Sequence, residues 1–246
     1  MGWICHNIAR MRRLLAAVSV VCGFVGASAG ASGSAPAAPP AAQPPPAAAI
    51  TVAPSRIAEA RALVPPPLLH ARFQPVVGTW VEYEYRSKAA RFPVRVAVVG
   101  MTQREDGQPL YQVELDYQTK PRTLMVAWVV GGARPLVERM AVSVPPTAPI
   151  SLPVDLYMDQ PELRGTLTEE KPTDIRAGRF AGKAEQRVYR QEDTQVVTVV
   201  LTPKVPVSGV ESIRDGTATW VARASGTEAQ PELRSVPIAI PRLPQQ

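Results

Sequence analysis

The chain has 246 residues and a formal net charge of +6, half of which comes from the first 31 residues. Without the three arginines of residues 1–31, 24 basic residues stand against 21 acidic ones, leaving a net charge of about +3. This charge is small and evenly spread, so the composition argues against nucleic acid or an anionic membrane surface as a partner.

Residues 1–31 have the three parts of a secretory signal peptide. Three arginines precede the apolar residues 14–26, and small residues follow at 27–31. The apolar run is shorter than the roughly 20 residues of a comfortable membrane span. We therefore expect export to the periplasm or outer envelope, with translation starting at Met1 or Met11. A retained N-terminal anchor is the alternative.

Both cysteines, Cys5 and Cys22, lie in this leader. The exported chain is therefore expected to contain no disulfide and no thiolate metal site. Lipidation at Cys22 is a second alternative, but the bulky Val21 before it is unlike the small residue that such signals carry. Membrane association is expected only if Cys22 is lipidated or the leader is retained.

An alanine- and proline-rich linker follows at 32–49, and its uncharged, low-complexity composition predicts disorder. Residues 50–75 are interpreted as a short helix and a lead-in to the folded domain. Ser55 is the expected helix cap, and the three prolines at 65–67 are expected to end the helix.

Residues 76–226 alternate short apolar runs with turn signals, a pattern typical of an antiparallel β domain. Residues 110–117 alternate apolar and polar side chains, which predicts a strand with one buried face. Residues 123–130 and 195–201 are apolar on both faces, so they need cover on both sides or a cavity on one. The predicted strands are residues 78–85, 94–99, 110–117, 123–130, 136–144, 184–190, 194–202, 210–213 and 217–224.

These strands predict a mainly β fold with a single curved antiparallel sheet, a half-barrel with one or two short helices or a long loop over one face. Residues 176–213 are expected to organise it, with a hairpin of two long strands that turns at 191–194. The proline-rich residues 145–165 are interpreted as a long excursion, which is either a lid over the sheet or a structural connection. The proline-rich tail, residues 227–246, is expected to be loosely held.

The chain resembles uncharacterised bacterial envelope proteins whose fold is similar to the Lol-type outer-membrane lipoprotein carriers and receptors. The resemblance covers roughly residues 76–220. It implies a curved antiparallel half-barrel whose open face is covered by helices and accepts acyl chains, but no functional residue of the family is carried over. Five stretches carry the resemblance: VVGTWVEYEY, VAVVG, DGQPLYQVELDY, AGRF and VPVSGV.

The sequence contains no phosphate-binding glycine loop and no H-E-x-x-H motif. Outside the leader there is one histidine, His70, and a lone histidine does not make a multi-histidine metal site. We therefore expect a structural role for His70, no cofactor and no enzymatic activity.

Two functions follow from these observations. The first is a non-catalytic binding module of the cell envelope with an apolar sheet face for a lipid, an acyl chain or another hydrophobic ligand. The second is a structural or protein-interaction module tethered by the linker, with an envelope protein as partner and no small-molecule ligand. The residues predicted to form the apolar face are Tyr111, Leu115, Leu124, Val126, Trp128, Val197, Val199 and Trp220.

Overall fold

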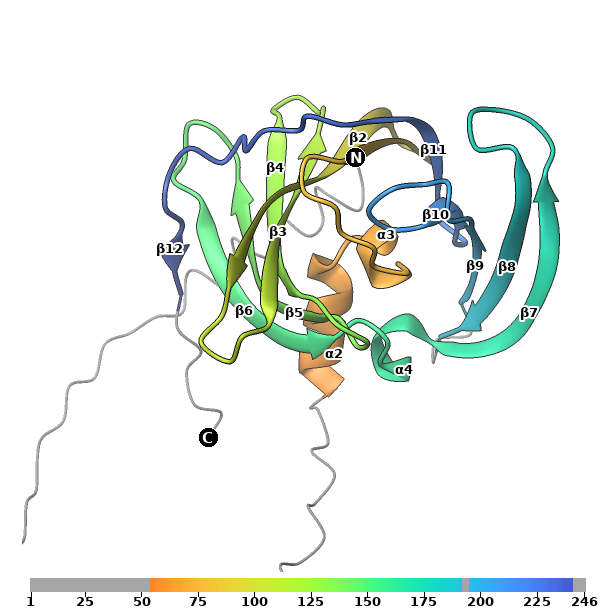
Figure 1. Cartoon of the computed structure of the whole chain (residues 1–246), viewed down its shortest axis with the longest axis horizontal. Coiled ribbons are helices and arrows are strands. Elements are labelled where there is room, and N and C mark those ends of the chain that lie inside the picture. The colour runs from red at the N-terminus through yellow and green to blue at the C-terminus, as the bar shows by residue number, and fades with distance from the viewer. Residues whose placement is uncertain (1–53, 192–194, 241–246) are drawn as a thin grey trace, which may run out of the picture.

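The computed structural model describes residues 54–191 and 195–240, so the predictions for the leader and the linker lie outside the described residues. The described chain forms one open, mostly antiparallel 12-stranded sheet with a few short helices (Figure 1). The prediction of a mainly β fold with a single antiparallel sheet is confirmed. The elements are α2 (Pro54–Leu63), α3 (Pro66–Leu69), β1 (Trp80–Ser87), β2 (Arg91–Gln103), β3 (Pro109–Tyr117), β4 (Thr123–Val130), β5 (Leu136–Ser143), β6 (Ile150–Tyr157), α4 (Pro161–Arg164), β7 (Thr166–Ile175), β8 (Gly182–Arg190), β9 (Val196–Leu201), β10 (Val210–Arg214), β11 (Ala218–Gly226) and β12 (Ile238–Ala239).

Two antiparallel meanders share this sheet. Its strand order is β12-β6-β5-β4-β3-β2-β1-β11-β10-β9-β8-β7. The first meander, β1 to β6, joins the second, β7 to β11, through antiparallel pairing of β1 with β11. The sheet curves around α2 and α3, which lie on its inner face (Figure 1). This arrangement places the helices where the sequence predicted cover over one face.

Aromatic side chains fill the inner face at the centre of the sheet. Strand β1 alternates buried Tyr83 and Tyr85 with more exposed glutamates, as its period-two pattern predicted. Trp220, only 1% exposed, packs edge-on against Tyr85 with ring centroids 5.0 Å apart. Tyr117 lies 6.3 Å from Trp220, and Phe92 stacks on Tyr85 at 4.6 Å. Edge-to-face and offset pairs of this kind add to the stability gained from apolar burial.

The VPVSGV stretch forms a buried corner between β9 and β10. The Tyr83 hydroxyl donates to the carbonyl of Val210 at 2.8 Å and lies 2.6 Å from the hydroxyl of Ser208, which is fully buried. Gly209 has φ = +70°, a conformation that glycine adopts at little steric cost. The lead-in crosses this corner, because the Gln74 amide donates to the carbonyl of Val207 at 3.0 Å.

The proline-rich C-terminal segment is held against the outer face, so the expectation of a loosely held tail is wrong for residues 227–240. We call these residues the C-terminal strap. The strap runs from β11 across the sheet to β12, which pairs in parallel with β6 (Figure 1). The buried carboxylate of Glu114 accepts hydrogen bonds from the amides of Glu232, at 2.7 Å, and Leu233, at 3.1 Å. Backbone contacts thus hold a segment whose composition gave no strand signal.

Residues 145–165 do not form a lid. They enter the sheet as β6, which pairs with β5, and then make the single helical turn α4. The apolar side chains of Val154 and Leu156 are buried because the strand runs beside β5. The interpretation of these residues as a structural connection is therefore the one that the fold supports.

Strand β7 was not predicted, because its sequence is polar and has no apolar alternation. It lies at the edge of the sheet, and most of its residues are exposed. Pro172 is tolerated there since an edge strand leaves one side of its backbone unpaired. Charged residues and proline are typical of edge strands that must not pair with other chains.

The prolines at 65–67 follow the end of helix α2, as predicted, but they also begin a second short helix that was not predicted. Helix α2 ends at Leu63, before the prolines, but Pro66 then begins the short helix α3. Proline suits the first turn of a helix because the N–H that it lacks would have no partner there. Ser55 lies inside α2, whose first residue is Pro54, so it is not the predicted cap.

Candidate functional site

The predicted apolar face is divided between two clusters. Leu115, Val197, Val199 and Trp220 belong to the main core on the inner face, and Tyr111 packs partly buried against it. Leu124, Val126 and Trp128 form a separate cluster with Ala141, against which Leu233 of the C-terminal strap packs. The eight residues therefore do not line one common site.

The physical reason is the alternation of side chains along β4. Its residue Met125 stands opposite Leu115 on β3, so both point to the inner face. Leu124 and Val126, on either side of Met125, must then point to the outer face. The sequence predicted that β4 has cover on both faces or a cavity on one; the structure has cover on both, since Leu233 of the strap packs on the outer face.

Strand β9, which was also predicted to have cover on both faces or a cavity on one, is well buried on its inner face only. Its inner residues Val197 and Val199 are buried, but Val196 on the other face is 47% exposed. The C-terminal strap covers the first meander, and β9 belongs to the second. The apolar residues on the outer face of β9 therefore have no comparable cover among the described residues.

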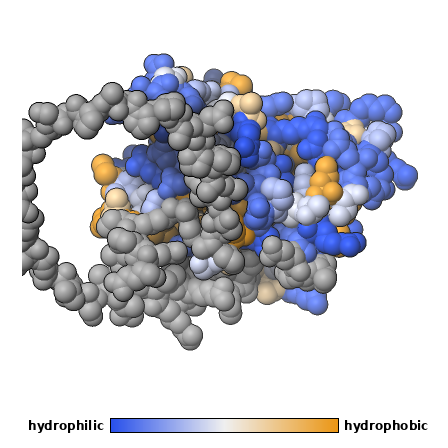
Figure 2. Space-filling view, turned by 90° about the horizontal axis from the view of Figure 1, so that it is seen from below, coloured by the Kyte–Doolittle hydropathy of each residue, from blue (hydrophilic) through white to orange (hydrophobic). Residues whose placement is uncertain are grey.

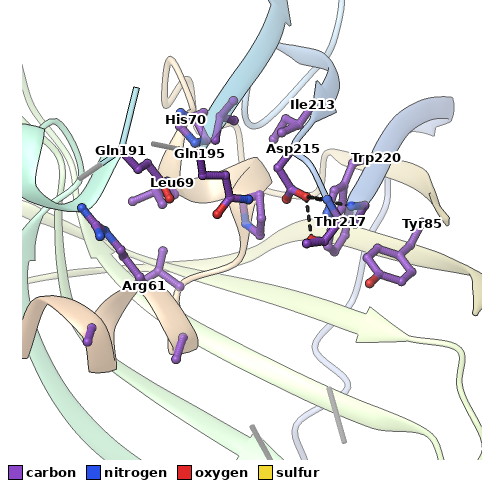
Figure 3. Close-up of a pocket in the computed structure, with 16 residues that line it drawn as sticks. Arg61, Leu69, His70, Tyr85, Gln191, Gln195, Ile213, Asp215, Thr217 and Trp220 are labelled. Carbon is purple, nitrogen blue, oxygen red and sulfur yellow. Dashed lines mark hydrogen bonds between the residues drawn. The ribbon is translucent and has the colours of Figure 1, made fainter. Parts of the chain in front are cut away.

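A pocket of about 410 Å³ lies between the helices α2 and α3 and the strands β9 to β11. Small-molecule sites typically have volumes of roughly 300 to 1,000 Å³. Two of the predicted site residues, Val197 and Trp220, line this pocket, and Trp220 is labelled in Figure 3. The other apolar lining residues are Ala58, Ala62, Val64, Pro66, Leu69, Tyr85, Ile213 and Ala218.

The helix contributes small residues to one wall of the pocket. Ala58 and Ala62 are four positions apart on α2, so they lie on the same helix face. Larger side chains at these positions would occupy the space. The spacing of the two alanines was visible in the sequence, but nothing there showed which face of the helix met a cavity.

Six polar residues complete the lining, and sequence reasoning identified none of them as site residues. They are Arg61, His70, Gln191, Gln195, Asp215 and Thr217. Figure 3 shows Arg61 and Gln191 on one side of the pocket and Asp215, Thr217 and Tyr85 on the other. These residues come from separate elements, so no spacing in the chain could have grouped them.

Asp215 is committed to the turn between β10 and β11. Its Oδ1 accepts hydrogen bonds from the amides of Thr217 and Ala218 and from the Thr217 hydroxyl, each at 2.7 Å. This is the usual use of aspartate in a turn, where the carboxylate satisfies backbone donors. The residue therefore shapes the pocket through the turn that it stabilises.

His70 is a buried neutral side chain at the base of α3. It is 3% exposed, and its ring lies 4.9 Å from the ring of Tyr189. Burial, with the nearby Arg164 guanidinium as the second cause, lowers the pKa of His70 to about 3. A histidine that stays neutral at physiological pH is consistent with the predicted structural role.

Metal and membrane features are not found in the described ranges. Residues 54–191 and 195–240 contain no group of three or more histidines, cysteines or acidic residues that could hold a metal ion. No helix in those ranges is long and apolar enough to cross a membrane. The described surface seen in Figure 2 is mostly hydrophilic, with apolar residues in small separate patches.

Comparison of the sequence with protein-family models and with curated proteins found no match. The resemblance to lipoprotein carriers and receptors therefore stays a prediction.

Proposed function

We propose that this chain is an exported, non-catalytic binding module of the cell envelope that holds a hydrophobic ligand in the pocket between α2–α3 and β9–β11. The observation that carries the proposal is the position of this pocket. It lies where a curved sheet and its covering helices leave space, and most of its lining is apolar. Trp220, Val197 and Ile213 provide the sheet side of the wall, and the alanines of α2 provide the helix side.

Apolar burial gives the energetic reason for such a ligand. Each buried methylene group contributes about 0.8 kcal/mol, so an alkyl chain gains affinity from an apolar wall without specific hydrogen bonds. The polar residues of the lining would offer hydrogen bonds to the other end of the ligand. Export is supported by the leader at 1–31, which has the features of a signal peptide.

The test is titration of the purified chain with N-phenyl-1-naphthylamine, an uncharged dye that becomes fluorescent in apolar surroundings. We expect saturable binding with one site per chain. Ala62→Phe places a large side chain in the pocket and should weaken dye binding at least tenfold, because it occupies the space that the dye needs. The dye carries no charge, so the result reports on the apolar wall alone.

Glu59→Phe is the matched control. It adds the same side chain to the same helix at an exposed position that does not line the pocket. Equal binding by both variants and the unmodified chain would show that the dye binds elsewhere. A chain that binds no dye would favour the alternative of an envelope scaffold or protein-interaction module.

A further inference from the structure

We propose that the ligand of this pocket is an amphipath with an anionic head group, held by Arg61 at the α2–α4 end of the pocket. The inference rests on the proposed function, because it names the class of ligand for the same pocket. The head group is a carboxylate or a phosphate, and the tail is an alkyl or acyl chain.

The first observation is the geometry of Arg61. Its Nε donates to the carbonyl of Leu163 at 3.2 Å, and its Nη2 donates to the carbonyl of Glu162. These contacts fix the guanidinium at the end of the pocket, where Figure 3 shows it extending from α2 toward the side on which Gln191 lies. Its Nη1 has no hydrogen-bond partner in the described part of the chain, so both N–H groups of Nη1 remain for a ligand.

The second observation is that, within residues 54–191 and 195–240, no carboxylate forms an ion pair with Arg61. Neither Arg61 nor Arg164 forms an ion pair with an acidic side chain of the described residues, and both side chains are partly buried. Arg164 instead donates from Nε to the carbonyl of Leu69 at 3.0 Å and lies 6.0 Å from the Tyr189 ring centroid. Burial lowers the pKa of Arg164. Arg164 does not line the pocket, and it lies near enough to Asp159 for the two charges to attract each other. Arg61 lines the pocket, and because partly buried charges are normally paired, its free N–H groups favour an anionic ligand.

The third observation is that Asp215, the carboxylate in the described lining of the pocket, does not pair with Arg61. Asp215 lies on the other side of the pocket, with Thr217 and Tyr85 (Figure 3). Its Oδ1 accepts three hydrogen bonds within its own turn. A ligand with its tail along Val197 and Trp220 could therefore place its anionic head at Arg61 and away from Asp215.

The experiment compares ligands that share one tail and differ in the charge of the head. Dodecanoate, dodecyl phosphate, dodecanol and dodecylammonium each displace the neutral dye from the purified chain, below their micelle concentrations. We expect the two anions to bind at least tenfold more tightly than dodecanol, and dodecylammonium to bind more weakly than dodecanol. Dodecanoate and dodecyl phosphate together show which anionic head is preferred.

Arg61→Gln should reduce the ratio of dodecanoate to dodecanol affinity about tenfold or more, because a hydrogen bond to a charged group contributes roughly 1.5 to 3 kcal/mol. The ratio is the readout because the substitution also removes the contacts between α2 and α4, and this weakens both ligands alike. Arg61→Lys keeps the charge and should retain most of the preference. Arg214→Gln removes the same charge from an exposed position outside the pocket and should leave the ratio unchanged.

The outcomes separate this inference from the proposed function. Saturable dye binding with equal affinity for dodecanoate and dodecanol would overturn the anionic head group and leave the apolar pocket intact. The same conclusion follows if Arg61→Gln and Arg214→Gln change the ratio equally, since the effect would then come from net charge. Failure of the dye to bind would overturn the proposed function itself.

Discussion

One buried carboxylate, that of Glu114, holds the middle of the C-terminal strap, whose two ends are attached by backbone hydrogen bonds. Glu114 is 3% exposed, and it accepts hydrogen bonds from the amides of Glu232 and Leu233 and from the side chain of Gln112 at 2.9 Å. Glu114→Gln replaces one accepting oxygen with an amino group that faces a donor. We predict that this substitution loosens the strap without unfolding the sheet.

The magnitude follows from the contacts. Losing one hydrogen bond to an ionised acceptor costs roughly 1.5 to 3 kcal/mol, and a buried donor left without a partner adds a cost of similar size. Because part of the strap can relax, we expect the free energy of strap opening to fall by about 2 to 4 kcal/mol. At 1.4 kcal/mol per factor of ten, amide exchange should accelerate by about 30-fold to 1,000-fold.

Hydrogen exchange measured by mass spectrometry tests this prediction. Peptides that cover residues 229–240 should exchange faster in Glu114→Gln, while peptides from β9 and β10 should not change. Glu82→Gln is the control, because Glu82 also lies on the outer face of the sheet but takes no part in the hydrogen bonds that join Glu114 to the strap. Strap exchange within threefold of the unmodified chain would refute the reasoning that Glu114 holds the strap.

Two further predictions concern the core. Val199→Asp buries an unpaired charge and should lower the free energy of unfolding by about 4 kcal/mol or more. Val196→Asp, on the exposed face, should change it by about 0.5 kcal/mol or less. Urea unfolding measures both changes, and similar losses would contradict the assigned faces of β9. Folding lowers the pKa of His70 from its ordinary value of 6.5 to about 3, so below pH 6.5 the unfolded chain binds a proton that the folded chain does not. The free energy of unfolding should therefore fall with decreasing pH by up to about 1.4 kcal/mol per unit, and His70→Phe should reduce this slope between about pH 6.5 and 5. An unchanged slope would show that His70 is not buried in its neutral form.

Local patterns in the sequence were sufficient for much of the sheet. The period-two alternation of β1 and β3 identifies the side chains on the inner face, because neighbouring residues of a strand point to opposite faces. The prediction that only one face of β3 is buried is wrong at Glu114, which is 3% exposed because the strap lies over it. The apolar run of β4 predicted cover on both sides or a cavity on one, and its predicted bounds, 123–130, agree with the strand itself. Turn signals between apolar runs favoured an antiparallel meander over helical connections.

Other elements carry no such local pattern. Strand β7 is polar because it lies at the edge, and β12 contains only Ile238 and Ala239. The prolines of 145–165 suggested a loop, yet β6 forms because β5 offers a partner strand. In each case the decisive interactions are backbone hydrogen bonds to a partner strand, which is a sequence neighbour for β6 and β7 and a distant segment for β12. The side-chain pattern of a strand does not record those bonds.

The sequence by itself determined that the chain forms a mainly β sheet, and it named residues that are buried in it, including Val197 and Trp220. Only the tertiary structure decided which of these residues share a site. Leu124 and Trp128 were separated from the pocket because β4 points them to the outer face, where the strap lies. Arg61 joined Trp220 in one pocket because α2 is placed against the inner face. A site is a set of distances between separate elements, and those distances are set by the curvature of the sheet and the packing of its cover.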